Sequence, residues 1–394
     1  MKKLKLSIAV LLGSAALFLA CSKDETSTNK ALVNFDAAYV VNGESNTISI
    51  INITTNKVAE TIDLTQLQSS LGTGQMEMGM TNMWPHHIYI SPDKSKLVIA
   101  AAGMDLSEGH NMSSTGGTTD AHSQHHGGSA AGSSASEPVM PGRILILDAV
   151  TGELLKELSL EGMTHNAVFS PDSKELWTSL MMPEGLVKVF DTVTYSLITS
   201  IPVGQMPAEV TFSDDGKKVF VANGMSNTVT VIDAATKKVI ETITVGNNPV
   251  GAWPGMNGMM YVDNEDGQSI SMVNSMTNMM TDTVNLGFTP GMAVRNSQMN
   301  QMWVSDPYGS KIHMWATNND EIHMLEKGYD EYIHGGVVAV GKGAHAIAFN
   351  KEGNVGYVTN QTEGTVSVVD VPNLKEMMKI DVGKKPNGIV IRNK

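Results

Sequence analysis

The sequence predicts an all-β fold, a seven-bladed β-propeller in which the N- and C-terminal strands complete one shared blade. Three observations predict it: a strand motif that recurs at a nearly constant interval, a strand pair before each copy, and incomplete blades at the two ends of the repeat region. A repeat of about 40 residues with several short strands is typical of propellers, because such a unit buries its apolar faces only against its neighbours.

The recurring motif is a strand that reads apolar-x-apolar-apolar-Asp or Asn and leads through a short polar turn into a second strand. Full copies occur at 48–52, 144–148, 187–191, 229–233, 270–274 and 366–370. A further copy at 312–316 is degenerate, because Ala316 replaces the acid. From Asp148 to Ala316 the copies follow at intervals of 41 to 43 residues, which indicates one structural unit repeated around a ring.

A strand pair joined by a tight turn precedes each copy of the motif. The turn at 91–93 reads Ser-Pro-Asp and the turn at 214–216 reads Asp-Asp-Gly, residue types that favour chain reversal. The strand after the turn reads Val219–Asn223 in one copy and Val355–Asn360 in another. With the motif, this makes four short strands per unit, which is the composition of one propeller blade.

A tetrapeptide in these strands carries a family resemblance. Residues 357–360 read Tyr-Val-Thr-Asn, and residues 220–223 and 39–42 are close variants. On these motifs the chain resembles the YVTN-repeat, YncE-like β-propeller lipoproteins, and the resemblance extends over almost all of residues 36–394. It implies a seven-bladed propeller over that range. It implies no particular activity, because one fold carries many functions.

The two ends of the repeat region complement each other. Residues 386–391 form an inner strand with no outer strands after it, and residues 38–62 form outer strands with no inner strand before them. We expect the two ends to make one blade together, which closes the ring and leaves no open sheet edge.

The first 20 residues have the features of a secretory signal peptide, with lysines near the start and an apolar run from Leu6 to Leu19. That run is short for a membrane span. Ala20 and Cys21 follow, a junction that resembles a lipoprotein lipobox. We expect a signal peptide at 1–20, lipid on Cys21 and an acidic linker at 21–35. Ordinary signal cleavage beside an incidental cysteine is the alternative.

The expected localisation and the net charge of the protein restrict the partners that it can bind. Residues 22–25 read Ser-Lys-Asp-Glu, which resembles the acidic tag of surface-exposed Bacteroidetes lipoproteins. We expect a monomeric outer-membrane lipoprotein, periplasmic or surface-exposed, that contacts the membrane through its lipid. Loss of the signal peptide removes three lysines and no acid, so the formal charge changes from −13 to −16. Such an acidic domain repels phosphate backbones, so we expect no nucleic-acid partner.

Two segments interrupt the repeat. Residues 103–142 are rich in Gly, Ser, Thr and His and lack hydrophobic periodicity, so we expect a flexible excursion there. Residues 317–341 extend the degenerate blade. Insertions in a propeller fall in loops at its rims, where binding residues concentrate.

Histidines gather where the inner strands begin. The position after the Pro or small residue at the start of each inner strand, the channel-ring position, is occupied in chain order by His86, His165, Ala208, Val250, Gly291, His345 and Asn387. The next position adds His87 and Glu209. Because equivalent positions ring one axis, these side chains are candidate ligands for copper, zinc or iron. The alternative is that they are hydrogen-bonded polar residues around a wet pore.

The histidine ring resembles a reduced version of the propeller of nitrous-oxide reductases, where histidines at the inner strands bind a copper cluster. The likeness is distant, because only three of the seven channel-ring positions are His. With Cys21 as the only cysteine, the chain also lacks a dinuclear copper site and a C-x-x-C-H motif for covalent haem. The haem-d1 propeller of nitrite reductases, which also has a channel His ligand, is a second distant likeness.

The chain contains 27 methionines. Met76, Met78, Met80 and Met83 alternate through a Gly-containing loop that leads directly to His86. Thioethers are soft ligands that select Cu(I), so copper is the cofactor that this composition favours. The 103–142 segment adds candidate loop ligands at His110, His122, His125 and His126. The alternative is that methionine serves as a flexible packing residue and oxidation sink.

The preferred function is that of an extracytoplasmic binding protein, with no catalytic residue assigned. Three hypotheses stay open: a copper-binding protein with its site at the channel mouth, a metal-free interaction scaffold, and a propeller hydrolase of the lactonase kind or a redox enzyme. The scaffold hypothesis places a protein partner on the loops at 71–85, 103–142 and 317–341. The hydrolase hypothesis assigns the chemistry to His165 or Glu209, and the chain contains no G-x-S-x-G or H-E-x-x-H motif in its support.

Overall fold

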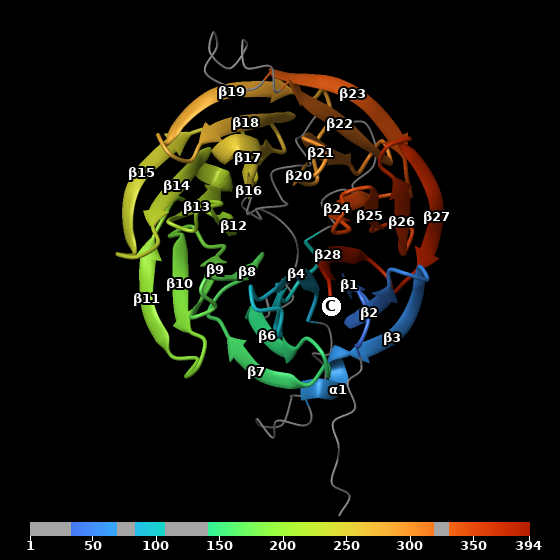
Figure 1. The fold of residues 1–394 in the computed structure, drawn as a ribbon. Coiled ribbons are helices and arrows are strands. Elements are labelled where there is room, and N and C mark those ends of the chain that lie inside the picture. The colour runs from blue at the N-terminus through green and yellow to red at the C-terminus, as the bar shows by residue number, and fades with distance from the viewer. Residues whose placement is uncertain (1–32, 69–82, 107–140, 319–330) are drawn as a thin grey trace, which may run out of the picture. The chain divides into compact units, whose positions relative to one another are not determined.

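The structure is a computed structural model that describes residues 33–68, 83–106, 141–318 and 331–394. In this part of the chain the strands form seven four-stranded antiparallel sheets, arranged as blades around a central axis (Figure 1). The predicted all-β, seven-bladed propeller is confirmed. Blades are numbered from the one that contains β1, and their strands are given from the axis outward.

Blades 1 to 4 are built from consecutive strands, except that blade 1 takes its inner strand from the C-terminus. Blade 1 contains β28 (Pro386–Arg392), β1 (Ala37–Asn42), β2 (Thr47–Asn52) and β3 (Lys57–Asp63). Blade 2 contains β4 (Pro85–Ile90), β5 (Lys96–Ala101), β6 (Arg143–Asp148) and β7 (Leu154–Ser159). Blade 3 contains β8 (Ala167–Phe169), β9 (Glu175–Leu180), β10 (Leu186–Asp191) and β11 (Leu197–Pro202). Blade 4 contains β12 (Pro207–Phe212), β13 (Lys218–Asn223), β14 (Thr228–Asp233) and β15 (Lys238–Thr244).

Blades 5 to 7 follow the same order around the ring. Blade 5 contains β16 (Pro249–Pro254), β17 (Met259–Asn264), β18 (Ser269–Asn274) and β19 (Met279–Asn285). Blade 6 contains β20 (Ala293–Asn296), β21 (Gln301–Asp306), β22 (Lys311–Asn318) and β23 (Glu331–Ala339). Blade 7 contains β24 (Ala344–Phe349), β25 (Val355–Asn360), β26 (Thr365–Asp370) and β27 (Lys375–Asp381). The short helices are α1 (Leu64–Gln68), η4 (Gly224–Ser226) and η5 (Met256–Gly258).

The ring closes through the predicted shared blade. β28 pairs antiparallel with β1, with Ala37 opposite Arg392 and Asn42 opposite Pro386. The N–H of Lys394 also donates to Asp36 Oδ1 at 2.6 Å, just beyond the last pair. The two ends of the propeller are therefore hydrogen-bonded into one sheet, which confirms the prediction.

Apolar clusters between neighbouring blades hold the ring together. β1 is buried along its whole length, whereas the outer strand β3 is exposed at all but one of its residues. Between blades 1 and 2, for example, Tyr39 and Ile50 pack with Ile99 and Leu147. The strands thus bury both faces against adjacent sheets, which explains the continuous apolar runs in the inner strands.

The acid of the recurring motif has a local structural role. Asp148 Oδ1 accepts the N–H groups of Val150 and Thr151 at 2.8 and 2.7 Å, and equivalent bonds recur at the motif positions of other blades. This bonding caps the turn between the third and fourth strands. In blade 6, where Ala316 occupies the position, β22 continues to Asn318 instead of turning.

The Asn of the Tyr-Val-Thr-Asn tetrapeptide ties two strands together. The Asn360 side-chain amide donates to Thr365 Oγ1 and Ser367 Oγ, each at 2.9 Å. The same bonds form from Asn42, Asn223 and Asn264 in blades 1, 4 and 5. These amides explain why the motif ends in Asn at the rim where the channel begins.

Several predicted segments fall at the edge of the described structure. The signal peptide, Cys21 and the linker up to residue 32 lie outside the described residues, as do residues 107–140 of the first interruption. The described residues of 317–341 include the end of β22 and all of β23, which is the outer strand of blade 6. In the described ranges no helix has the length and apolarity needed to cross a membrane.

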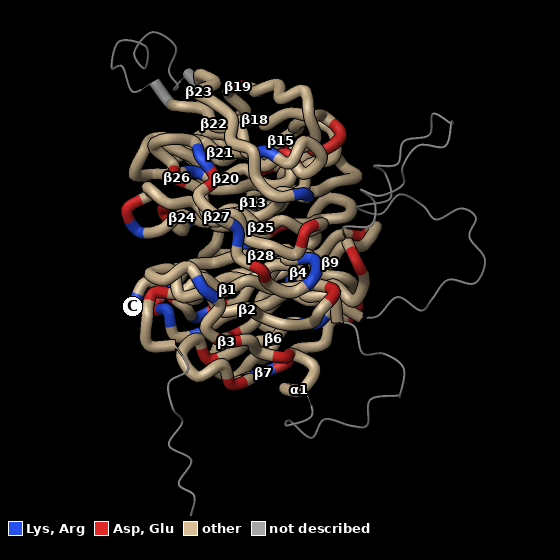
Figure 2. Tube along the Cα trace, turned by 90° about the vertical axis from the view of Figure 1, so that its right-hand side faces the viewer, with Lys and Arg blue, Asp and Glu red and all other residues tan. Residues whose placement is uncertain are grey.

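Charged residues of both signs are interspersed over the side of the ring that Figure 2 shows. Most strands are uncharged along much of their length in this view, and the charges gather near turns.

Candidate metal centre in the channel

Five polar residues meet at the start of the inner strands. β4 supplies His86 and His87, the segment before β8 supplies His165, β12 supplies Glu209 and β24 supplies His345. Glu209 has no exposed surface, and the four imidazoles are between 4 % and 9 % exposed. Such burial of five polar side chains at one place requires that they bond to one another or to a ligand.

The ring of His86 lies close to the other three imidazole rings. The ring of His86 lies 4.4 Å from that of His165, 4.7 Å from that of His87 and 5.7 Å from that of His345, measured between centroids. One ligand atom from each of His86, His87 and His165 lies within 4.8 Å of the other two. The structure thus brings together every histidine that the sequence placed at the channel ring.

Glu209 joins two of these imidazoles. Its Oε1 lies 2.5 Å from His165 Nδ1 and 3.1 Å from His87 Nε2. The hydroxyl of Tyr89 donates to Oε2 at 3.3 Å. A contact as short as that between His165 and Glu209 requires a proton between the two atoms. Glu209 therefore fixes the orientation of the His165 ring.

A neighbouring amide fixes the position of Glu209. The Asn166 side chain donates to the carbonyl of Val210 at 2.9 Å and accepts the N–H of Val210 at 3.0 Å. Thr178 Oγ1 in turn donates to the Asn166 carbonyl at 2.6 Å. The segment before β8 and the strand β12 are thus bonded together beside Glu209, although residues 164–166 are not themselves part of a strand.

Burial keeps two of the imidazoles neutral. It lowers the pKa of His87 well below the usual range, and nearby His345 lowers that pKa further. Burial also lowers the pKa of His345, against the opposing effect of its hydrogen bond to the Asn387 carbonyl. Because that carbonyl only accepts, at 2.9 Å, neutral His345 carries its proton on Nδ1 and a lone pair on Nε2. Neutral imidazole is the form that binds metal ions.

Two buried acids have the opposite shift. Burial raises the pKa of Glu209 well above its usual range, and the Asp263 carboxyl raises it further. Burial likewise raises the pKa of Asp263, with a contribution from Glu265. Asp263 Oδ1 accepts the Gly251 N–H and the Trp253 Nε1–H at 2.8 and 3.0 Å, and its buried Oδ2 has no hydrogen-bond partner among the described residues. A cation in the channel would favour the charged form of both acids.

The imidazoles fit a transition-metal ion. A divalent ion lies about 2.0–2.1 Å from each ligating imidazole nitrogen. Three atoms at most 4.8 Å apart lie at most about 2.8 Å from their common centre, so each has to move by less than about 0.8 Å. Glu209, bonded to His165 Nδ1, then takes the place of the carboxylate that orients a metal-bound histidine.

Of the other predicted ligands, only Met83 lies in the described part of the chain, and it does not join this cluster. Met83 packs in the apolar cluster between blades 1 and 2, with Val41 and Ile48. The remaining candidates lie outside the described residues, namely Met76, Met78, Met80, His110, His122, His125 and His126.

Sequence reasoning missed the supporting residues Tyr89, Asn166, Trp253 and Asp263. For Asp263 a signal was present, because residues 261–264 read Tyr-Val-Asp-Asn and place an acid where the tetrapeptide has Thr. An acid in the otherwise apolar second strand of a blade indicates a polar site. For the other three, nothing in the local pattern separates a site residue from a packing residue.

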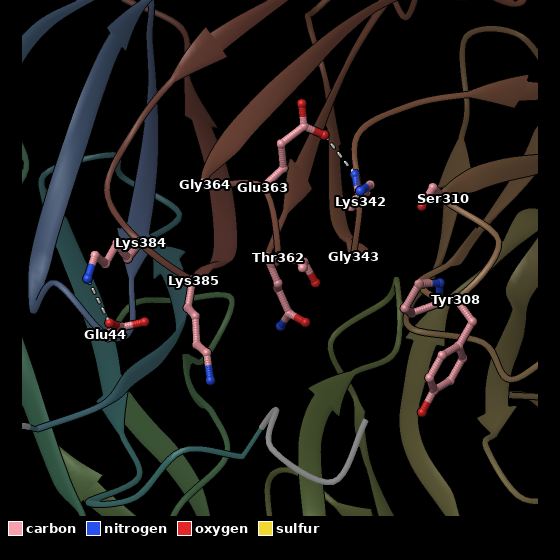
Figure 3. A pocket seen from close by; sticks show the side chains of 12 residues that line it. Glu44, Tyr308, Ser310, Lys342, Gly343, Thr362, Glu363, Gly364, Lys384 and Lys385 are labelled. Carbon is pink, nitrogen blue, oxygen red and sulfur yellow. Dashed lines mark hydrogen bonds and ion pairs between the residues drawn. The ribbon is translucent and has the colours of Figure 1, made fainter. Parts of the chain in front are cut away.

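A separate pocket of about 630 Å³ lies at the rim of blades 1, 6 and 7 (Figure 3). Lys384 pairs with Glu44 at 3.0 Å, and Lys385 and Tyr308 lie on opposite sides of the hollow. None of the four channel histidines lines it. Buried Gln361 links this pocket to the channel site. It lines the pocket and donates to Asn387 Oδ1 at 2.8 Å, and the carbonyl of Asn387 is bonded to His345.

Fold and site together define a seven-bladed β-propeller with a buried histidine–glutamate cluster in its channel. Residues 165–257, from His165 through blade 4 and into η5, match the model of the YNCE-like beta-propeller family. Over this range the expected likeness to YncE-like propellers is confirmed. No curated protein matches the sequence.

Several solved structures share the fold. A functionally unknown protein from Desulfotomaculum acetoxidans DSM 771 has a TM-score of 0.66 and 12 % identity, over 91 % of this chain and 99 % of that one. Hydrazine synthase from Kuenenia stuttgartiensis has a TM-score of 0.59 and 13 % identity, over 82 % and 98 %. The dihydro-heme d1 dehydrogenase NirN in complex with DHE has a TM-score of 0.53 and 12 % identity, over 90 % and 74 %. At these identities the likeness is one of fold.

Proposed function

We propose that this chain is a metal-binding β-propeller in which His86, His87 and His165 hold one divalent transition-metal ion, with copper as the favoured ion. The observation that carries the proposal is the convergence of three buried imidazoles whose ligand atoms lie within 4.8 Å of one another. His345 adjoins the same cluster and is a candidate fourth ligand, since its ring lies 5.7 Å from that of His86.

The donor set supports copper among the divalent ions. Imidazole suits Zn(II), Cu(II), Fe(II) and Ni(II), and Cu(II) has the highest affinity of the series for a given nitrogen site. Burial keeps His87 neutral, so no proton has to leave it before an ion binds. The carboxyl of Glu209 lies on the opposite side of the His165 ring from Nε2, through its bond to Nδ1, and increases the basicity of that ring.

The burial of the cluster favours retention of an ion over turnover of a substrate. With its imidazoles at most 9 % exposed, the site has little room for an organic substrate beside a metal ion. We further propose that the protein is extracytoplasmic and anchored through lipid on Cys21, on the strength of the apolar run at 6–19 and the single cysteine after it. The protein is thus proposed as a membrane-attached metal-binding protein.

Metal titration tests this proposal. The full chain, stripped with a chelator, is titrated with Cu(II) and separately with Zn(II), and compared with the His86→Ala/His165→Ala/His345→Ala variant. We expect one tightly bound ion per chain in the wild type and its loss in the triple variant. His313→Ala/His334→Ala is the matched control, because these histidines lie on β22 and β23 outside the channel cluster.

A second variant separates the channel from the predicted loop ligands. Deletion of residues 107–140 removes His110, His122, His125 and His126 and should leave the tightly bound ion in place. If the tight ion disappears with this deletion and survives in the triple channel variant, the channel is not the metal site. If no form binds an ion tightly, the metal-free interaction scaffold becomes the better account.

A further inference from the structure

Methionines form a second group of metal-ligating side chains beside the channel site. Met163, Met181 and Met206 pack with Ala102 and Leu106 in one apolar cluster. Met181 is 3 % exposed and Met206 is 4 % exposed. These three side chains, termed the Met cluster below, were not among the methionines that the sequence singled out.

The Met cluster adjoins the imidazole site along the chain. Met163 lies two residues before His165, and Met206 lies three residues before Glu209. Met163 and Met206 occupy the same position of blades 3 and 4, two residues before the channel-ring position. The N–H of Met181, directly after β9, donates to the Met163 carbonyl at 2.9 Å. Met163 and Met206 therefore lie in connectors that lead into the site, and Met181, between β9 and β10, is hydrogen-bonded to the first of them.

Other blades place residues other than methionine at the equivalent positions, including Trp84 in blade 2 and Thr289 in blade 6. The residue two before the channel-ring position is Asn248 in blade 5, Gly343 in blade 7 and Lys385 in blade 1. The residue after the second strand, equivalent to Met181, is Glu265 in blade 5 and Gln361 in blade 7. At these two positions thioethers therefore occur only in blades 3 and 4, the two blades that supply His165 and Glu209.

Met206 shares its backbone conformation with equivalent residues of other blades, whereas Met163 does not have this positive φ. Met206 has φ of 49°, and Asn248 and Lys385 at the equivalent position have 53° and 51°. This left-handed conformation suits Asn or Gly better than Met. A further thioether lies close by, because a Cβ added to Gly162 would meet Met182 Sδ at 3.0 Å. The glycine leaves room for that sulfur beside Met163.

We propose that the Met cluster, with Met182 beside it, is a thioether site for a soft monovalent cation, Cu(I), at the mouth of the imidazole channel. Thioether sulfur selects Cu(I) over Zn(II), whereas imidazole accepts both. Neutral ligands in an apolar surrounding hold a single positive charge at lower desolvation cost than a double one. The choice of copper as the physiological ion rests on the proposed function, but the thioether site itself can be tested separately.

Ag(I) is the probe, because it is soft, monovalent and does not change oxidation state under the conditions used. The full chain is labelled with ¹³C at the methionine methyl groups, and single Met→Leu variants assign Met163, Met181 and Met206. We expect the first equivalents of Ag(I) to shift these three resonances together. The Met163→Leu/Met181→Leu/Met206→Leu variant should bind one Ag(I) fewer and keep the Zn(II) stoichiometry of the wild type. Leu replaces Met at nearly constant volume, so the cluster keeps its packing.

Met279→Leu/Met280→Leu is the matched control, because these methionines are exposed on β19 in blade 5. This variant should bind as much Ag(I) as the wild type. The proposal is overturned if the three resonances do not move with Ag(I), or if the triple variant binds as much Ag(I) as the wild type. The resonance test needs only the wild type and the single Met→Leu variants that assign its signals. It therefore decides on the proposal even if the triple variant does not fold. If the wild type binds no Zn(II) or Cu(II) while the three resonances still respond to Ag(I), the imidazole proposal fails and the thioether site stands.

Discussion

Replacement of Glu209 by Gln lowers the affinity of the channel for a divalent ion by roughly 10- to 100-fold, the usual cost of removing a carboxylate behind a metal-bound histidine. Glu209 Oε1 lies 2.5 Å from His165 Nδ1, so this carboxyl is in direct contact with the ring. Gln still accepts the His165 N–H but carries no charge. The ring of His165 keeps its orientation and becomes a weaker base, so the ion binds less tightly.

The metal-free protein should tolerate this change well. Burial raises the pKa of Glu209 above its ordinary value of 4.5, so the unfolded chain releases this proton at a lower pH than the folded protein does. Glu209 therefore costs the metal-free protein stability at every pH above about 4.5. Gln removes that cost, so the melting temperature of the metal-free variant at pH 7 should equal or exceed that of the wild type, and the difference should vanish below pH 4.5. Glu157→Gln, on the outer strand β7, is the control for loss of one carboxylate. Unchanged affinity for Zn(II) and Cu(II) in Glu209→Gln would show that Glu209 does not support a metal ligand.

Removal of β28 should abolish cooperative folding of the propeller. Deletion of residues 386–394 takes the inner strand from blade 1, and with it the pairing of Ala37 with Arg392 and of Asn42 with Pro386. It also removes Asn387, whose side chain donates to the Pro85 carbonyl at the start of β4. The edge of β1 and the apolar face between blades 1 and 7 then become exposed to water. Far-UV circular dichroism during thermal denaturation should show no cooperative transition.

A circular permutant is the control for this deletion. The new chain begins at residue 384 and joins Lys394 to Val33, so that β28 immediately precedes β1 as the first strand of a hairpin. The ends to be joined are close, since Arg392 lies opposite Ala37. The permutant keeps every contact of β28 and should melt within a few degrees of the wild type. A truncated chain that melts as cooperatively as the permutant would contradict the closure described here.

The fold could be predicted from the sequence because the bonds that define each blade form between residues close together in the chain. The recurring Asp or Asn caps its turn through bonds within three residues, and the Asn of the tetrapeptide bonds within seven, so both act locally and repeat with the period. Blade equivalence then placed His86, His165 and His345 around one axis. The repeat period does not show whether these side chains contact one another or which neighbouring residues orient them. The structure shows both.

Asn166 and Tyr89 could not be predicted as supporting residues because they act between blades. Asn166 holds Val210 of the next blade, and Tyr89 of blade 2 reaches Glu209 of blade 4 across the channel. The local sequence pattern around these residues indicates neither contact. The Met cluster escaped notice for a related reason, since Met163, Met181 and Met206 stand far apart in the sequence and each reads as an ordinary apolar residue at a strand boundary.

Anomalous diffraction at the copper edge, from crystals of the full chain grown with Cu(II), tests the central claim most directly. The account predicts one copper ion bonded at about 2.0–2.1 Å to nitrogens of His86, His87 and His165, with Glu209 bonded to His165 and not to the ion. Copper found only outside the channel, or an empty channel at saturating Cu(II), would contradict it.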